Sequence, residues 1–167
     1  MSYDLWVFSP EAEVIRKETL KEKMLAEGWE IRFLPHSAFL GKKNFTLLPS
    51  VGALDDSIML AGWPANQANS ELLAQLFCQG DVKQLDTLFM DEYAFGLCSY
   101  GVSNYDNTAQ PEAKTQYTLY CRGGNLQDAW ELMHTTWEAI AVLTNGEAVN
   151  PQEGEGVMGP PEEMEWE

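Results

Sequence analysis

Basic residues are scarce in this sequence, and beyond residue 43 they almost vanish. The 167 residues include 10 Lys and Arg against 26 Asp and Glu, a formal net charge of −16. Residues 1–43 hold seven of each sign, so residues 44–167 hold three basic against nineteen acidic residues and carry the whole excess. Such a surface repels phosphate backbones, which argues against nucleic-acid binding, but it attracts basic proteins and speeds encounter with them.

Cysteine and long apolar runs are scarce as well. The three cysteines, Cys78, Cys98 and Cys121, form no CxxC pair and no zinc-type spacing with histidine, so we expect reduced thiols. No apolar stretch approaches the roughly 18 residues that a membrane span needs. The first residues lack the positive charge of a signal peptide. We therefore expect a soluble cytoplasmic protein without a membrane segment.

Motifs for nucleotides, metals and other cofactors are missing too. The chain has no GxGxxG, no GxxxxGK and no DxDxDG, and Gly123-Gly124 before a helix is typical of an ordinary turn. The adjacent acidic pairs at 55–56 and 91–92 favour turns or solvated loops over cation sites. We therefore predict no cofactor, no metal site and no catalytic residues.

What the sequence does contain is alternating strand and helix patterns. Serine, proline and glutamate at 9–11 are typical of a helix start. Leu126, Trp130, Met133, Trp137 and Ile140 fall at steps of four, three, four and three, the period of one buried helix face. Strands are expected at 3–8, 29–34, 57–63, 93–100, 116–122 and 148–149, and helices at 10–26, 69–77, 82–90 and 126–143.

This order predicts one α+β domain over residues 1–151. We expect a mixed or mainly antiparallel sheet covered by two main helices, with a ferredoxin-like arrangement carrying an insertion as one solution. Residues 101–114 are polar and are expected to form a mobile hairpin loop. Residues 152–167 hold six glutamates and no basic residue, which predicts a flexible acidic tail.

The only histidines are His36 and His134. His134 falls within the last long helix beside Met133, where a structural role is the favoured interpretation. His36 follows Pro35 at a strand end, a common place for active-site residues, yet no motif ties a nucleophile or carboxylate to it. A small enzyme using one of these histidines with carboxylates remains an alternative, because catalytic groups are assembled in space.

The two ends of the chain carry a resemblance. The segments YDLWVFSPEA and DAWELMHTTWEAIAVLTNGEAVNPQEGE resemble small acidic bacterial immunity proteins of interbacterial toxin systems. The resemblance implies a non-catalytic cytoplasmic protein that binds a cognate toxin and blocks it, and no catalytic residues carry over.

We therefore expect a protein partner, a basic toxin domain, and a chain that is itself a monomer or a homodimer. A self-associating structural or adaptor protein is a further alternative. Since the excess charge lies after residue 43, the partner-binding residues are expected among the carboxylates flanking the predicted strands and loops. They are Asp55, Asp56, Asp91, Glu92 and Asp106.

Overall fold

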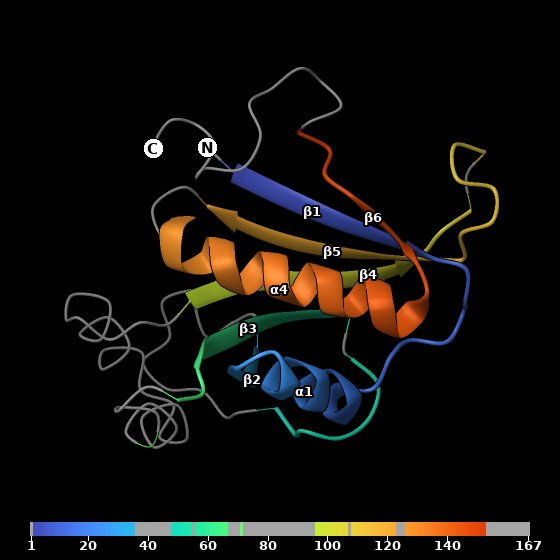
Figure 1. Cartoon of the computed structure of the whole chain (residues 1–167). Coiled ribbons are helices and arrows are strands. Elements are labelled where there is room, and N and C mark those ends of the chain that lie inside the picture. Colours follow the sequence, from blue (N-terminus) through green and yellow to red (C-terminus); the bar gives the residue numbers. More distant parts are fainter. Residues whose placement is uncertain are drawn as a thin grey trace.

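The computed structural model describes residues 2–35, 48–54, 56–66, 71, 96–106, 108–122 and 126–152. The strands are β1 (Ser2–Ser9), β2 (Trp29–Pro35), β3 (Ser57–Pro64), β4 (Gly96–Asn104), β5 (Thr115–Arg122) and β6 (Glu147–Val149). The helices are α1 (Lys17–Ala26) and α4 (Leu126–Thr144). Both helices lie on the same side of the sheet in Figure 1, which confirms the predicted α+β class.

The sheet has the order β2-β3-β4-β5-β1-β6, and every pairing in it is antiparallel. Strand β1 lies between β5 and β6, so β5, α4 and β6 form a split βαβ unit. Likewise α1 links β1 to β2 across the width of the sheet. These are the two crossovers of a ferredoxin-like arrangement. Strands β3 and β4 are the additional pair, which matches the predicted insertion.

The core lies between the sheet and the two helices. Leu5, Phe33 and Leu60 point into it from the strands, and Met24 and Met133 meet them from α1 and α4. Each of these side chains is at most 2% exposed. The alternation of buried and accessible residues along the strands follows from a sheet with one face under helices.

A glycine sets how closely α4 approaches the sheet. A Cβ placed on Gly62 of β3 would lie 2.6 Å from the Cδ1 atom of Leu132, which is fully buried in α4. Only a residue without a side chain leaves room for Leu132 at this point.

The predicted helix at 10–26 is wrong in its first half, because α1 begins at Lys17. Ser9 does not cap a helix; its hydroxyl accepts a bond from the Glu11 N–H (3.0 Å) in a local turn. The backbone of Ile15 is held by distant groups: its N–H donates to the Tyr117 hydroxyl (3.1 Å), and its carbonyl accepts from Leu54. These tertiary hydrogen bonds use the backbone N–H and carbonyl groups that would otherwise pair within a helix.

The predicted loop at 101–114 also needs correction. Strand β4 runs through Asn104, so the first four residues of the expected loop 101–114 belong to a strand. Lys17, the first residue of α1, is only 3% exposed. Gly28, with a positive φ of 92°, follows the end of α1. The predicted helices at 69–77 and 82–90 lie outside the described residues apart from Glu71, which is helical.

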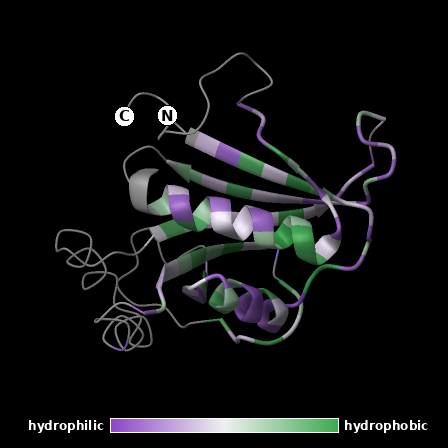
Figure 2. Cartoon of the chain, viewed as in Figure 1, coloured by the Kyte–Doolittle hydropathy of each residue, from purple (hydrophilic) through white to green (hydrophobic). Residues whose placement is uncertain are grey.

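The two helices differ in the hydropathy of their residues. Figure 2 colours α1 mainly hydrophilic, whereas α4 alternates hydrophobic and hydrophilic residues along its length. Within the described ranges, no helix is both long and apolar enough to cross a membrane.

Candidate functional site

His134 lies in a cluster of aromatic rings between α4 and β1. Its ring centroid is 3.8 Å from that of Trp130 and 5.2 Å from that of Trp137, and the Tyr3 ring lies on the β1 side at 6.1 Å. Trp137 fixes this part of α4 to the sheet, because its Nε1–H donates to the Trp6 carbonyl oxygen at 2.7 Å. We call Tyr3, Trp130, His134 and Trp137 the aromatic cluster.

A chain of polar groups links the aromatic cluster to the segment after β6. The Asn150 side-chain amide donates to the Tyr3 hydroxyl oxygen at 2.8 Å, and this hydroxyl lies 3.4 Å from the His134 Nε2 atom. Gln152 contacts Asn150 and also bonds both backbone groups of Asp4: its Oε1 accepts from the N–H and its Nε2 donates to the carbonyl, each at 2.9 Å. Gln152 thus pairs with β1 as a neighbouring strand would.

This environment makes His134 a poor catalytic base at neutral pH. Burial lowers the pKa of His134 to about 4, because desolvation disfavours the charged imidazolium ion. Its hydrogen-bonding contact is the Tyr3 phenol rather than a carboxylate. A general base works best with a pKa near the working pH. His36, the other histidine considered, lies outside the described residues.

The buried thiols show no sign of activation. The register of β4 and β5 pairs Ser99 with Tyr120, which sets Cys98 opposite Cys121. Both thiols are free and buried; burial raises the pKa of Cys121 to about 11 and that of Cys98 further still. Both remain protonated at neutral pH, as expected for core thiols. Within the described part of the chain, no three Cys, His, Asp or Glu side chains converge as metal ligands would.

Several exposed carboxylates of the described residues lie at one end of the sheet. Strands β1 and β4 end there, and strands β3, β5 and β6 begin there. The strand register shows this: Ser9 and Asn104 both pair with Thr115. Likewise, Phe8 pairs with Glu147, and Ser57 pairs with Gly101. Figure 1 shows these strand ends and the 105–114 loop together at the right-hand side. Five exposed acidic residues at this end, which we call the acidic sheet end, are Glu11, Asp56, Asp106, Glu112 and Glu147.

Two of the five residues predicted to bind a partner belong to this acidic sheet end. Asp56 directly precedes β3 and Asp106 follows β4, and both are exposed. The structure thus brings together two residues that are 50 positions apart in the sequence. Asp55, Asp91 and Glu92 lie outside the described residues. Glu11, Glu112 and Glu147 were not predicted to bind a partner, and only the strand order carries Glu11 and Glu147 to this end.

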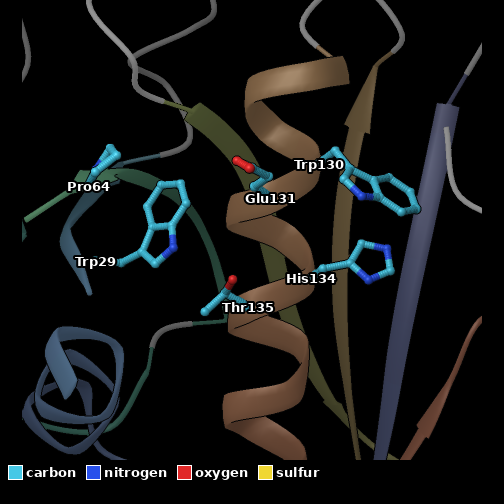
Figure 3. Close-up of a pocket in the computed structure, with 6 residues that line it drawn as sticks. All are labelled: Trp29, Pro64, Trp130, Glu131, His134 and Thr135. Carbon is cyan, nitrogen blue, oxygen red and sulfur yellow. The ribbon is translucent and has the colours of Figure 1, made fainter. Parts of the chain in front are cut away.

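A separate pocket lies between α4 and the paired ends of β2 and β3. It has a volume of about 400 Å³ and is lined by Trp29, Pro64, Trp130, Glu131, His134 and Thr135. In Figure 3, Trp29 and Pro64 stand on one side of the pocket, and Glu131 and Thr135 project toward them from α4. The register pairs Trp29 with Pro64. Sequence patterns could not indicate this pocket, because its two walls meet only after α4 packs on the sheet.

Comparisons with known proteins give no relative for this chain. No family model, no curated protein and no solved structure matches it. Its function must therefore be inferred from its own residues.

Proposed function

We propose that this protein is a non-catalytic acidic inhibitor that binds a basic protein, a bacterial toxin domain, and blocks it as an immunity protein does. The observation that carries the proposal is the acidic sheet end. There, exposed carboxylates from four segments lie at one end of the sheet: the β1–α1 connection, the residue before β3, the β4–β5 loop and the start of β6. A concentrated negative potential of this kind steers a positively charged partner and favours its correct orientation.

The acidic sheet end suits recognition because its side chains are not needed to hold the fold. Asp56, Asp106 and Glu147 are exposed, while the buried core lies between the sheet and the helices. Such residues can vary to fit one partner with little effect on folding, which is how related inhibitors distinguish their targets. The resemblance of the chain ends to immunity proteins and the net charge of −16 support the same proposal.

An enzyme using His134 is the second candidate, and the surroundings of His134 argue against it. Its lowered pKa keeps it neutral, and although Glu131 lines the same pocket, the hydrogen-bonding contact of His134 is the Tyr3 hydroxyl and aromatic rings pack around it. His36 leaves the enzyme hypothesis open to experiment. A turnover activity abolished by His36→Ala would replace the inhibitor proposal.

The direct test is co-expression with the product of the adjacent gene. We expect a one-to-one complex through gel filtration, and loss of the toxicity that this product shows when expressed alone. The double variant Asp56→Lys/Asp106→Lys should fold normally and give reduced protection. The absence of a complex would contradict the proposal.

A further inference from the structure

The pocket beside α4 combines an aromatic wall with a carboxylate. Trp29 is half-buried at the start of β2 and lines the pocket together with Pro64. Across from them, α4 supplies the exposed side chain of Glu131 and, one turn later, the half-buried Thr135. An indole, a carboxylate and a hydroxyl around a cavity of about 400 Å³ form a surface with one anionic group and several apolar ones.

The charge of Glu131 has no counterion among the described residues. Among these residues, ion pairs join Arg16 to Glu18, Lys23 to Glu27 and Arg32 to Glu30. Arg32 is further occupied by the Trp63 ring, 5.3 Å from its guanidinium carbon. A group entering the pocket would therefore meet an uncompensated negative charge at Glu131.

We propose that this pocket receives an arginine side chain of the partner protein. A planar guanidinium can stack on the Trp29 ring while its N–H groups donate to the Glu131 carboxylate, and the Thr135 hydroxyl offers a further acceptor. An aliphatic side chain would desolvate Glu131 without replacing its hydrogen bonds, and an acidic one would be repelled. Lysine fits less well, because its ammonium group lacks the planar fork that stacks and binds bidentately.

This inference rests on the proposed function, because the proposed function identifies the partner protein that carries the arginine. It deepens that function by adding an anchor to the electrostatic steering. Exposed charges chiefly raise the association rate, whereas an arginine held between an aromatic ring and a carboxylate slows dissociation. The acidic sheet end and the pocket are thus expected to affect different rate constants.

The chemistry can be tested on the full chain without the partner. The probe is acetyl-glycyl-arginyl-glycinamide, titrated into ¹⁵N-labelled protein while the indole N–H signals are followed by NMR. We expect a saturable shift of the Trp29 indole signal and of the Glu131 and Thr135 amide signals, with a dissociation constant in the millimolar range. The norleucine analogue, which has a shorter aliphatic side chain and no charge, should cause no saturable shift there.

Variants of α4 provide the matched control. Glu131→Gln should weaken binding of the arginine peptide about tenfold, the loss of one charge-assisted contact. Glu138→Gln removes the same charge from an exposed position two turns away on α4 and should leave the affinity unchanged. Equal binding of the norleucine peptide, no shift at Trp29, or equal effects of the two variants would overturn the proposal.

Experiments with the partner complex separate this inference from the proposed function. If the adjacent gene product binds and Glu131→Gln leaves its dissociation rate unchanged, the arginine anchor is wrong and the inhibitor function stands. If the peptide binds at Trp29 as expected and no partner complex forms, the pocket chemistry stands and the inhibitor function is wrong.

Discussion

The aromatic cluster and the acidic sheet end differ in nearly every physical respect. In the aromatic cluster, Trp130 is 6% exposed and His134 is held in its neutral form. At the acidic sheet end, carboxylates such as Asp56 and Asp106 are exposed on connections between strands. The first region stabilises the fold, and the second is exposed to solvent.

This difference assigns separate roles to the apolar and the charged parts of the sequence. Substitutions in the aromatic cluster should change the free energy of unfolding, because they remove buried contact area. Substitutions at the acidic sheet end should change association rates instead, because exposed charges contribute little to stability. The predictions below test this division, beginning with the largest expected effect.

Trp130→Ala should destabilise the protein by about 3–5 kcal/mol, the usual cost of truncating a buried aromatic side chain. Trp130 contacts both Tyr3 and His134, with ring centroids at 4.6 Å and 3.8 Å. Urea unfolding followed by circular dichroism measures the change. Trp137→Ala should cost less, since Trp137 is only half-buried. Wild-type stability in Trp130→Ala would show that the aromatic cluster is not part of the stabilising core.

Gly62→Ala should destabilise the protein by about 1–3 kcal/mol through overpacking, because the new methyl group would collide with Leu132. Gly101→Ala is the matched control in the adjacent strand. There the closest atom to the added Cβ is the Asp56 carbonyl oxygen at 3.9 Å, an ordinary contact. Equal melting temperatures for the two variants would contradict the close packing of α4 on β3.

As the pH falls, protonation of His134 in the unfolded state should destabilise the protein before most carboxylates become protonated. The pKa of His134 falls from 6.5 to about 4 on folding, so the unfolded state binds a proton first and stability is lost as pH drops below about 6.5. The expected loss by pH 4 is about 1–2 kcal/mol after allowance for partial solvent exposure. Burial raises the pKa of Asp4, which acts with the opposite sign around pH 4.

His134→Gln should therefore flatten the decline in stability between pH 6.5 and pH 5, where Asp4 is ionised in the unfolded chain. Denaturant unfolding at a series of pH values gives this slope. His36→Gln serves as the comparison that separates the two histidines. A steep decline that persists in His134→Gln would assign the pH dependence to another group.

Charge reversal at the acidic sheet end should have the smallest effect on folding. Asp56→Lys and Asp106→Lys are expected to change the free energy of unfolding by less than about 0.5 kcal/mol each, as is usual at exposed sites. Thermal unfolding checks this value. A loss of several degrees in melting temperature would show that these carboxylates hold the strand connections in place.

The sequence predicted most of the strands and the long helix, because their patterns are local. The spacing of five residues predicted one buried face of α4. Trp130, Met133 and Ile140 are buried, whereas Trp137 is half-buried and the side chain of Leu126 lies outside the described residues. The start of α1 was predicted wrongly, because Ser9 and Pro10 favour a helix locally while Tyr117 and Leu54 bind the backbone of Ile15 from distant positions.

The candidate sites were less predictable than the fold. Net charge indicated an acidic surface, yet only the strand order shows that Asp56 and Asp106 lie at the same end of the sheet as Glu147. The pocket was missed because Trp29 and Glu131 are about 100 positions apart and neither belongs to a motif. Such sites depend on how α4 lies across β2 and β3, which local patterns do not encode.

The most direct test of the central claim is the association rate with the adjacent gene product, measured by stopped-flow fluorescence at several salt concentrations. The inhibitor account predicts that the wild-type rate falls steeply as salt rises, because screening shortens the reach of the acidic sheet end from roughly 30 Å at 0.01 M to about 10 Å at 0.1 M. Asp56→Lys/Asp106→Lys should associate more slowly and with a weaker salt dependence. An association rate that is independent of both salt and these two charges would contradict the account.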